Sequence, residues 1–234
     1  MSTSDLQRVA LITGASQGLG RAVAQGLAES GWALIIDARR ADRLQPAAAE
    51  LAAHTKVVAI AGDVSNPSHR EQLVAAVHEL GRIDLLVNNA STLGASPLPA
   101  LAAIDLEVFR QIYEVNVVAP LALTQQLLPA LTASHGTIVN VTSDAAVEAY
   151  EGWGGYGSSK AALEQLSAIL AVEHPDVRVL VVDPGDMRTE MHQDAFPGED
   201  ISDRPLPVGV APGVGALIES DHPGGRVRAA EVVS

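Results

Sequence analysis

The chain has 234 residues, of which 47% are hydrophobic, enough for one domain with a substantial core. It carries 15 basic and 28 acidic residues, and the resulting net charge of −13 lacks the basic footprint that nucleic-acid binding requires. The absence of cysteine excludes disulfides, thiolate metal sites and a cysteine nucleophile. The seven histidines include no H-x-x-x-H pair, so we expect no metal site.

The N-terminal segment 1–8 is polar and lacks the apolar core of a signal peptide. No run approaches the ~18 uninterrupted apolar residues that a membrane span needs. We therefore expect a cytoplasmic protein that does not contact membranes.

Short apolar runs alternate with amphipathic segments along most of the chain. Strands are expected at 9–12, 33–36, 57–60, 83–87, 137–141 and 177–182, with 226–233 as a candidate last strand. Helices are expected at 18–30, 40–53, 67–80, 105–131 and 156–173, with Pro120 as a candidate kink. Segment 186–215, rich in proline, glycine and charge, reads as irregular.

This alternation predicts a single α/β domain over 1–234, a doubly wound parallel sheet with helices on both faces, which is the Rossmann fold. Ligands of such sheets bind beyond the carboxyl ends of the strands. The loops that follow the strands are therefore where a site is expected.

The loop after the first strand has glycines at 14, 18 and 20 and opens a helix. We expect Gly14 to make a tight turn, Gly18 to leave room for a phosphate, and Gly20 to let the helix pack closely. A helix N-terminus offers free N–H groups and a positive dipole end to a pyrophosphate. An ordinary glycine-rich turn has the same composition, but the position after the first strand favours dinucleotide binding. The expected contacts are Gly14, Ser16, Gln17, Gly18, Leu19 and Gly20.

The residues after the second strand indicate which cofactor binds. An acid there bonds the ribose 2′-OH of NAD, whereas an arginine accommodates the 2′-phosphate of NADP. The sequence offers Asp37, then Arg39 and Arg40, and Asp37 lies one place early for the ribose acid. We favour NADP(H), with Arg39 on the phosphate and Arg40 assisting. Asp37 keeps NAD(H) open, and Gln17 stands where a second basic residue would have helped.

Tyr156 and Lys160 are spaced i, i+4 and would share one face of a helix. A neighbouring ammonium favours the phenolate, so Lys160 would bring the pKa of Tyr156 towards a range that is useful for proton transfer. Ser143 ends a strand 13 residues earlier and could hold a substrate oxygen beside the phenol. A surface Tyr–Lys pair and a strand-end serine would look the same in isolation.

Together these segments resemble the short-chain dehydrogenase/reductase family over about residues 8 to 190. The matching motifs are TGASQGLG at 13–20, Asp63-Val64, Asn88-Asn89-Ala90, Asn116-Val117, Ser143, Tyr156 to Lys160, and Pro184-Gly185 with Thr189. The chain departs from the family's Asn-Asn-Ala-Gly motif at Ser91, which stands where the family has glycine.

The resemblance implies a role for each matched residue. Tyr156 would be the general acid/base, Lys160 would bind the nicotinamide ribose and lower the tyrosine's pKa, and Ser143 would position the carbonyl. Asn116 would hold a helix distortion and a water that relays protons to Lys160. The implied cofactor contacts elsewhere are Asp63, Val64, Asn89, Ala90, Pro184, Gly185, Met187 and Thr189.

We therefore expect an NADP(H)-dependent oxidoreductase that reduces a carbonyl to an alcohol, or the reverse, on a small molecule. An NAD-dependent alcohol dehydrogenase of the same fold is the main alternative. A non-catalytic dinucleotide sensor is disfavoured, because such proteins usually lose the tyrosine or lysine. A short substrate lid is expected at about 187–205. His192 in this lid and Trp153 before Tyr156 are candidate substrate contacts, although a lid surface residue and a packing aromatic would look the same in the sequence. The family resemblance also implies a homodimer or homotetramer built on the helices 105–131 and 156–173.

Overall fold

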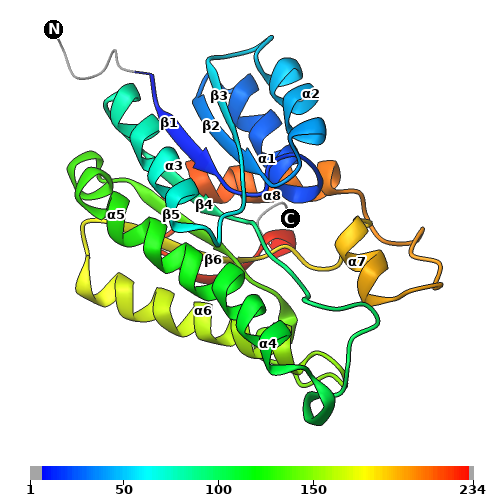
Figure 1. Ribbon diagram of the computed structural model, residues 1–234. Coiled ribbons are helices and arrows are strands. Elements are labelled where there is room, and N and C mark those ends of the chain that lie inside the picture. Colours follow the sequence, from blue (N-terminus) through cyan, green and yellow to red (C-terminus); the bar gives the residue numbers. More distant parts are fainter. Residues whose placement is uncertain (1–6, 232–234) are drawn as a thin grey trace, which may run out of the picture.

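The computed structural model describes residues 7–231, which form a seven-stranded parallel sheet flanked by helices (Figure 1). The strand order is β3-β2-β1-β4-β5-β6-β7, so the direction of winding reverses between β1 and β4. The strands are β1 Val9–Ile12, β2 Ala33–Ala38, β3 Val57–Ala61, β4 Leu85–Asn88, β5 Thr137–Val141, β6 Arg178–Asp183 and β7 Gly225–Arg228. The predicted doubly wound Rossmann sheet is confirmed.

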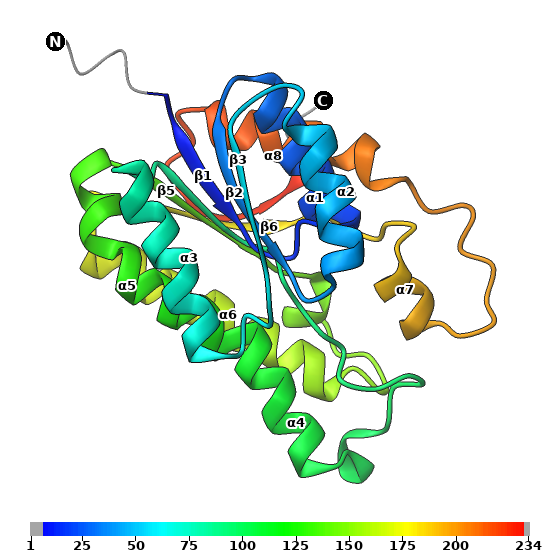
Figure 2. The same cartoon turned by 45° about the horizontal axis from the view of Figure 1, so that its top comes forward.

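Helices cover both faces of the sheet (Figure 2). Helices α1, α2 and α8 lie on one face, and α3, α5 and α6 on the other. The helices are α1 Gly18–Glu29, α2 Ala41–Leu51, α3 Pro67–Leu80, α4 Leu106–Tyr113, α5 Ala119–Ser134, α6 Gly154–Glu173, α7 Glu190–Ala195 and α8 Pro207–Glu219. The short helix α7 lies apart from both layers, beyond the carboxyl ends of the strands.

The core is divided in two by the sheet, because successive strand residues point to opposite faces. Ile12 packs with Leu27 of α1 on one side, and Leu11 packs with Leu73 of α3 and Leu127 of α5 on the other. All four residues of β1 are buried. This explains why the central strands are continuous apolar runs rather than alternating ones.

The long helix expected at 105–131 is interrupted. It consists of α4, a π-helical turn at Glu114–Val118 (η3), and α5. The predicted kink at Pro120 is therefore misplaced, because the irregularity precedes the proline, which lies in the first turn of α5. Pro120 has no N–H to give the carbonyl four residues back, that of Asn116, which disfavours regular α-helix there. The backbone N–H of Ala119 instead bonds the Glu114 carbonyl in the wider π pattern.

Helix α8 was not expected, since segment 186–215 reads as irregular. Its sequence contains Pro207 and Pro212 together with three glycines, all poor helix formers. Its buried residues Val214 and Leu217 belong to the core that includes α1, so tertiary packing outweighs local propensity here.

The expected last strand is shorter than 226–233. Strand β7 ends at Arg228 and is followed by a 3₁₀ turn at Ala229–Glu231, and the remaining two positions lie outside the described residues. Strand β7 lies at the edge of the sheet, where it pairs on one side with β6. Its polar composition suits this position, because charged side chains are common on edge strands.

Leu106–Ser134 is a 29-residue helical stretch in which an 18-residue segment has mean hydropathy 1.2, long and apolar enough to cross a membrane by length and composition alone. Leu123, Leu127 and Leu131 of this stretch are fully buried in the core against the sheet.

Candidate active site

A cavity of about 360 Å³ follows the carboxyl ends of the strands from the glycine loop to helix α6. It is lined by every residue that the sequence predicts for catalysis or cofactor binding except Gly20 and Asn116. Residues spread from 14 to 189 along the chain are thus brought to one surface by the parallel topology.

The glycine loop packs tightly against the end of β4. Gly14 has a φ of +67°, and a Cβ there would lie 2.9 Å from the Cα of Ala90. A Cβ on Gly20 would lie 2.4 Å from Nδ2 of Asn89, which donates a hydrogen bond to the Thr13 carbonyl at 2.8 Å. Gly14 and Gly20 therefore have the structural roles that the loop spacing predicts.

The N-terminus of α1 opens onto the cavity without a side-chain cap. Gln17 is the N-cap residue in an extended conformation, and its side chain accepts no bond from the first turn. The first N–H groups of a helix have no partner within the helix itself. At Gly18 the nearest atom to an added Cβ is a Thr189 methyl 3.7 Å away, which leaves the approach to these donors open.

The two arginines after β2, Arg39 and Arg40, differ in their hydrogen bonds and ion pairs. Arg39 makes no hydrogen bond or ion pair with any residue from 7 to 231, and it lines the cavity. Arg40 also lines the cavity, but its guanidinium pairs with Asp42 of the same helix turn at 2.6 Å. Of the two predicted phosphate ligands, Arg39 is the one whose charge is available.

Asp37 lines the cavity, but protein groups already engage its carboxylate. The residue is 1% exposed, and its carboxylate accepts a hydrogen bond from the Gly14 N–H at 2.8 Å and pairs with Nε2 of His69 at 3.0 Å. The alternative that Asp37 bonds a ribose stays a prediction. Burial raises the pKa of Asp37, and the bonds from His69 and Gly14 oppose that rise. The acid therefore serves to anchor the glycine loop.

Tyr156 and Lys160 lie on the buried face of α6, as their spacing predicts. The Lys160 Nζ donates to the Val141 carbonyl at 2.9 Å and lies 5.5 Å from the centroid of the Tyr156 ring. Burial lowers the pKa of Lys160 to about 8 and raises the pKa of Tyr156 well above its usual value near 10. Burial dominates the pKa of Tyr156 here, and the Lys160 ammonium bonds a carbonyl rather than the phenol, so the expected lowering of the tyrosine's pKa by Lys160 stays a prediction.

Ser91, the residue that replaces the family's glycine, lines the cavity together with Tyr156. Its hydroxyl partly offsets the rise in the pKa of the Tyr156 phenol. The same hydroxyl lies 3.1 Å from Oδ1 of Asn116. Ser91 thus interacts with two residues that the family resemblance assigns to proton handling.

Asn116 is fully buried within the π-helical turn. Its Oδ1 accepts from the Thr92 N–H at 2.9 Å, and its Nδ2 donates to the Thr92 carbonyl and to the Ser159 hydroxyl, each at 3.0 Å. The side chain therefore joins the β4 loop to helix α6, and it does so at the helix distortion that the resemblance implies.

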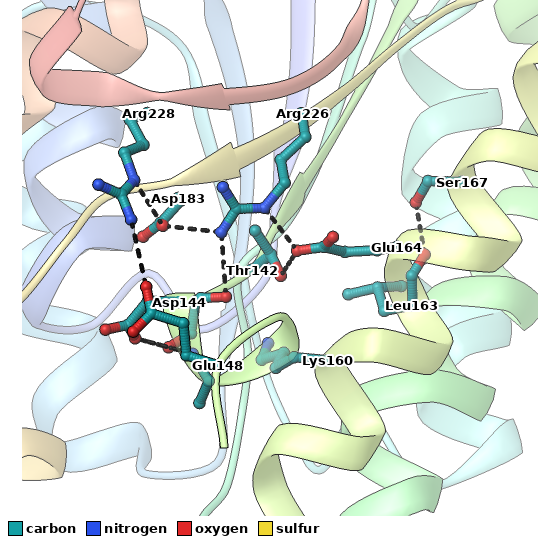
Figure 3. Close-up of polar contacts among 12 residues, drawn as sticks. Thr142, Asp144, Glu148, Lys160, Leu163, Glu164, Ser167, Asp183, Arg226 and Arg228 are labelled. Carbon is teal, nitrogen blue, oxygen red and sulfur yellow. Dashed lines mark hydrogen bonds and ion pairs between the residues drawn. The ribbon is translucent and has the colours of Figure 1, made fainter. Parts of the chain in front are cut away.

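Ser143 lines the cavity beside Tyr156, but its hydroxyl donates to Asp144 Oδ1 at 2.9 Å. Its backbone is held from β7, since Arg226 Nη2 approaches the Ser143 carbonyl at 3.4 Å. Arg226 also pairs with Asp183 at 2.9 Å and with Glu164 at 3.1 Å (Figure 3). One arginine on the edge strand thus ties the ends of β5 and β6 to α6.

The far end of the cavity is bounded by aromatic and lid residues. The Trp153 ring lies 5.7 Å from the Tyr156 ring and 5.9 Å from Phe196. His192 of α7 is 9% exposed and also lines the cavity. The Ser96 hydroxyl donates to the Asp194 carbonyl at 2.7 Å, so the lid expected at 187–205 is attached to the loop after β4.

The sequence analysis did not predict four features of the site: the effect of Ser91 on Tyr156, and the roles of His69, Arg226 and Arg43. His69 and Arg226 bond to partners more than 30 positions away, and no local pattern indicates such pairs. Arg43 had a usable signal, because it lies one helical turn after the arginines that were considered.

The chain's residues fit a dinucleotide. Glycines clear the backbone beside an uncapped helix N-terminus, which suits a pyrophosphate. Arg39, which makes no hydrogen bond or ion pair within residues 7–231, supplies a cation to the cavity that the Tyr156 side chain also lines.

Comparison with known proteins identifies the family. Residues 8–200 match the sequence profile described as short chain dehydrogenase. The chain belongs to the short-chain dehydrogenase family. Rat sepiapterin reductase is 39% identical over 199 residues, covering 79% of this chain and 76% of that protein. Serine 3-dehydrogenase of Agrobacterium fabrum is 39% identical over 186 residues, covering 77% and 72% respectively.

Solved structures of related short-chain dehydrogenases share the fold. An alcohol dehydrogenase from the archaeon Thermococcus sibiricus, complexed with 5-hydroxy-NADP, superposes with a TM-score of 0.84 at 30% identity and 95% coverage of both chains. A short chain dehydrogenase from Shigella flexneri complexed with NADP gives a TM-score of 0.86 at 29% identity, covering 97% of this chain and 99% of that one. The protein is an oxidoreductase of this family.

Replacing Gly20 with alanine should destabilise the protein and weaken dinucleotide binding. The added methyl would meet the Asn89 amide at 2.4 Å and the Gly14 carbonyl at 2.6 Å, so the loop or the helix must move. Gly26→Ala is the matched control, because no atom lies within 4 Å of its Cβ position in the same helix. We expect the control to be neutral or to stabilise by up to ~1 kcal/mol. Equal urea midpoints for the two variants would contradict the packing role.

Replacing Lys160 with methionine should raise the free energy of unfolding at pH 7, because it removes a buried ammonium. The gain is at most roughly 3 kcal/mol, and the loss of the hydrogen bond to the Val141 carbonyl reduces it. The pKa of the buried amine falls to about 8 from its unfolded value of 10.5, so between these pH values the unfolded chain binds more protons. The stability contributed at Lys160 therefore rises with pH across this window. Urea unfolding should show that the free energy of unfolding of the variant exceeds that of the parent by less at pH 9.5 than at pH 7. A difference between the two proteins that does not change with pH would contradict this prediction.

Proposed function

We propose that the protein is an NADP(H)-dependent oxidoreductase that interconverts a carbonyl and an alcohol on a small molecule. The observation that carries this proposal is the shared cavity, where the Tyr156 phenol, Ser143 and Lys160 lie on the same surface as the glycine loop and Arg39. The bound nicotinamide would supply or accept the hydride. The relatives solved with NADP and with 5-hydroxy-NADP support the same cofactor here.

In the reductive direction Tyr156 is the general acid. Burial holds its pKa above the usual value, so at neutral pH the phenol keeps the proton that the carbonyl oxygen must receive. Ser143 would orient that oxygen once its hydroxyl turns from Asp144 to the substrate. Lys160 would bind the nicotinamide ribose, and Asn116 would support the path that returns a proton to Lys160.

The preference for NADP(H) rests on Arg39 and Asp37. Arg39 lacks a partner among residues 7–231 and lines the cavity, whereas both oxygens of Asp37 are engaged by Gly14 and His69. These contacts weaken the alternative of an NAD-dependent alcohol dehydrogenase. The presence of both Tyr156 and Lys160 favours an enzyme over a dinucleotide sensor.

We also propose a cytoplasmic homodimer or homotetramer. Val118 beside α5 is exposed, as are Ile169 and Val172 on α6, with Val172 82% exposed. A partner subunit covering these side chains would remove them from water.

Replacing Tyr156 with phenylalanine should lower turnover by roughly 10³-fold or more while the fold is retained, because the ring stays in place and only the hydroxyl that carries the transferable proton is removed. Turnover is followed by the absorbance of the reduced nicotinamide on a panel of ketones, aldehydes and alcohols with both cofactors. Tyr113→Phe, on α4 with its ring 4.8 Å from Phe109, is the control and should keep parental turnover. Near-parental activity of Tyr156→Phe would refute the assignment.

Replacing Arg39 with alanine should weaken NADPH binding by at least about tenfold and leave NADH binding nearly unchanged, since only NADPH carries the 2′-phosphate. Arg40→Ala is the matched comparison, and we expect a smaller effect because Asp42 already holds that guanidinium. The measurement is the dissociation constant of each reduced cofactor by fluorescence titration. Equal losses for the two cofactors would argue against a phosphate contact.

A further inference from the structure

A third arginine, Arg43, stands at the adenosine end of the cofactor cavity. It lies in the first turn of α2, and it lines the cavity together with Arg39 and Arg40. Its side chain is 32% exposed, less than the 59% of Arg40. Arg43 was assigned no role from the sequence.

The partners of Arg43 come from two other elements that frame the cavity. Its Nη1 donates to Oε2 of Glu190 at 2.6 Å and also to Oε1 of Gln17. Gln17 is the N-cap of α1 in the glycine loop, and Glu190 is the first residue of the lid helix α7. The Gln17 amide in turn donates to the same Glu190 oxygen at 3.1 Å. The glycine loop, α2 and the lid therefore converge on one carboxylate.

Arg40 does not share this arrangement. The guanidinium of Arg40 hydrogen-bonds to Asp42, two residues along the chain, whereas the hydrogen bonds of the Arg43 guanidinium within residues 7–231 go to Gln17 and Glu190 across the cavity. The hydrogen bonds from Arg43 and then Gln17 hold the pKa of Glu190 below its usual value, so the acid is ionised at neutral pH. An anion thus lies against Arg43 at the cavity wall.

A phosphate would compete well for this position. A phosphate monoester carries a charge of about −1.5 to −2 at neutral pH and three strong acceptor oxygens. Arginine binds it through two parallel N–H donors. Glu190 offers a single charge in a partly exposed ion pair, which is a weak interaction that solvent screens.

We propose that Arg43 is a second cation for the 2′-phosphate of NADP(H), and that Glu190 is the internal anion which this phosphate displaces. The inference rests on the proposed use of NADP(H) and adds to it a specificity residue and a competitor. It also explains how a glycine loop carrying the neutral Gln17 can serve a phosphorylated cofactor, since α2 supplies the charge beside it.

The test is a fluorescence titration of NADPH and NADH, at fixed salt, with the intact protein and four variants. Arg43→Ala should weaken NADPH binding about tenfold and change NADH binding less than twofold. Glu190→Gln should tighten NADPH binding severalfold without affecting NADH. Gln17→Arg combined with Arg43→Ala should restore NADPH binding, because the new guanidinium stands where the two side chains met. Arg110→Ala, an exposed arginine on α4 paired with Glu107, controls for the loss of a positive charge and should change neither constant.

The outcomes separate this inference from the function on which it rests. Parental protein that binds NADH as tightly as NADPH would refute the cofactor preference and the inference together. Parental protein that prefers NADPH, with Arg43→Ala keeping that preference, would refute the role of Arg43 alone. Equal weakening of both cofactors by Arg43→Ala would show that the residue only holds the loop and lid together. An unchanged NADPH constant in Glu190→Gln would refute the competition.

Discussion

The close contact between the glycine loop and the end of β4 is the constraint on which the rest of the site depends. The Thr13 hydroxyl accepts hydrogen bonds from the N–H groups of Asn89 and Ala90, and the Asn89 amide bonds back to the loop carbonyls. Glycine at 14 and 20 is the condition for this approach, because any Cβ would meet those groups. The contact fixes the N-terminus of α1 at the point where the strand order reverses, and a cavity follows along the strand ends.

Desolvation shifts the pKa values of Tyr156 and Lys160 in opposite directions. Both residues are almost fully buried, and burial disfavours the charged form of each, which raises the pKa of Tyr156 and lowers that of Lys160 to about 8. The phenol therefore keeps its proton at neutral pH. Ser91 acts in the opposite direction on the pKa of the phenol, so the serine that replaces the family's glycine affects Tyr156 as well as the cavity wall.

Charged side chains on strands and helices connect the strand ends that carry these groups. Arg226 joins β5, β6 and α6 from the edge strand, and Asp37 with His69 anchors the glycine loop from β2 and α3. The Arg43–Glu190 pair does the same between α2 and the lid, but in a position open to solvent. The buried pairs are structural because breaking them would leave a charge without water, whereas the exposed pair can exchange partners at low cost.

The sequence by itself determined the strands, most helices, the glycine loop and the shared face of Tyr156 and Lys160. Each of these depends on residues within one or two turns, where periodicity and backbone sterics leave few choices. Tertiary structure decided what the polar groups bond. The burial of Asp37 against His69 needed a partner 32 residues away, and Lys160 found a carbonyl on β5 rather than the phenol. Helix α8 formed against its own composition because α1 offered an apolar surface. Hydrogen-bond partners and buried faces are chosen among elements far apart in the chain, and only their packing brings the competing choices together.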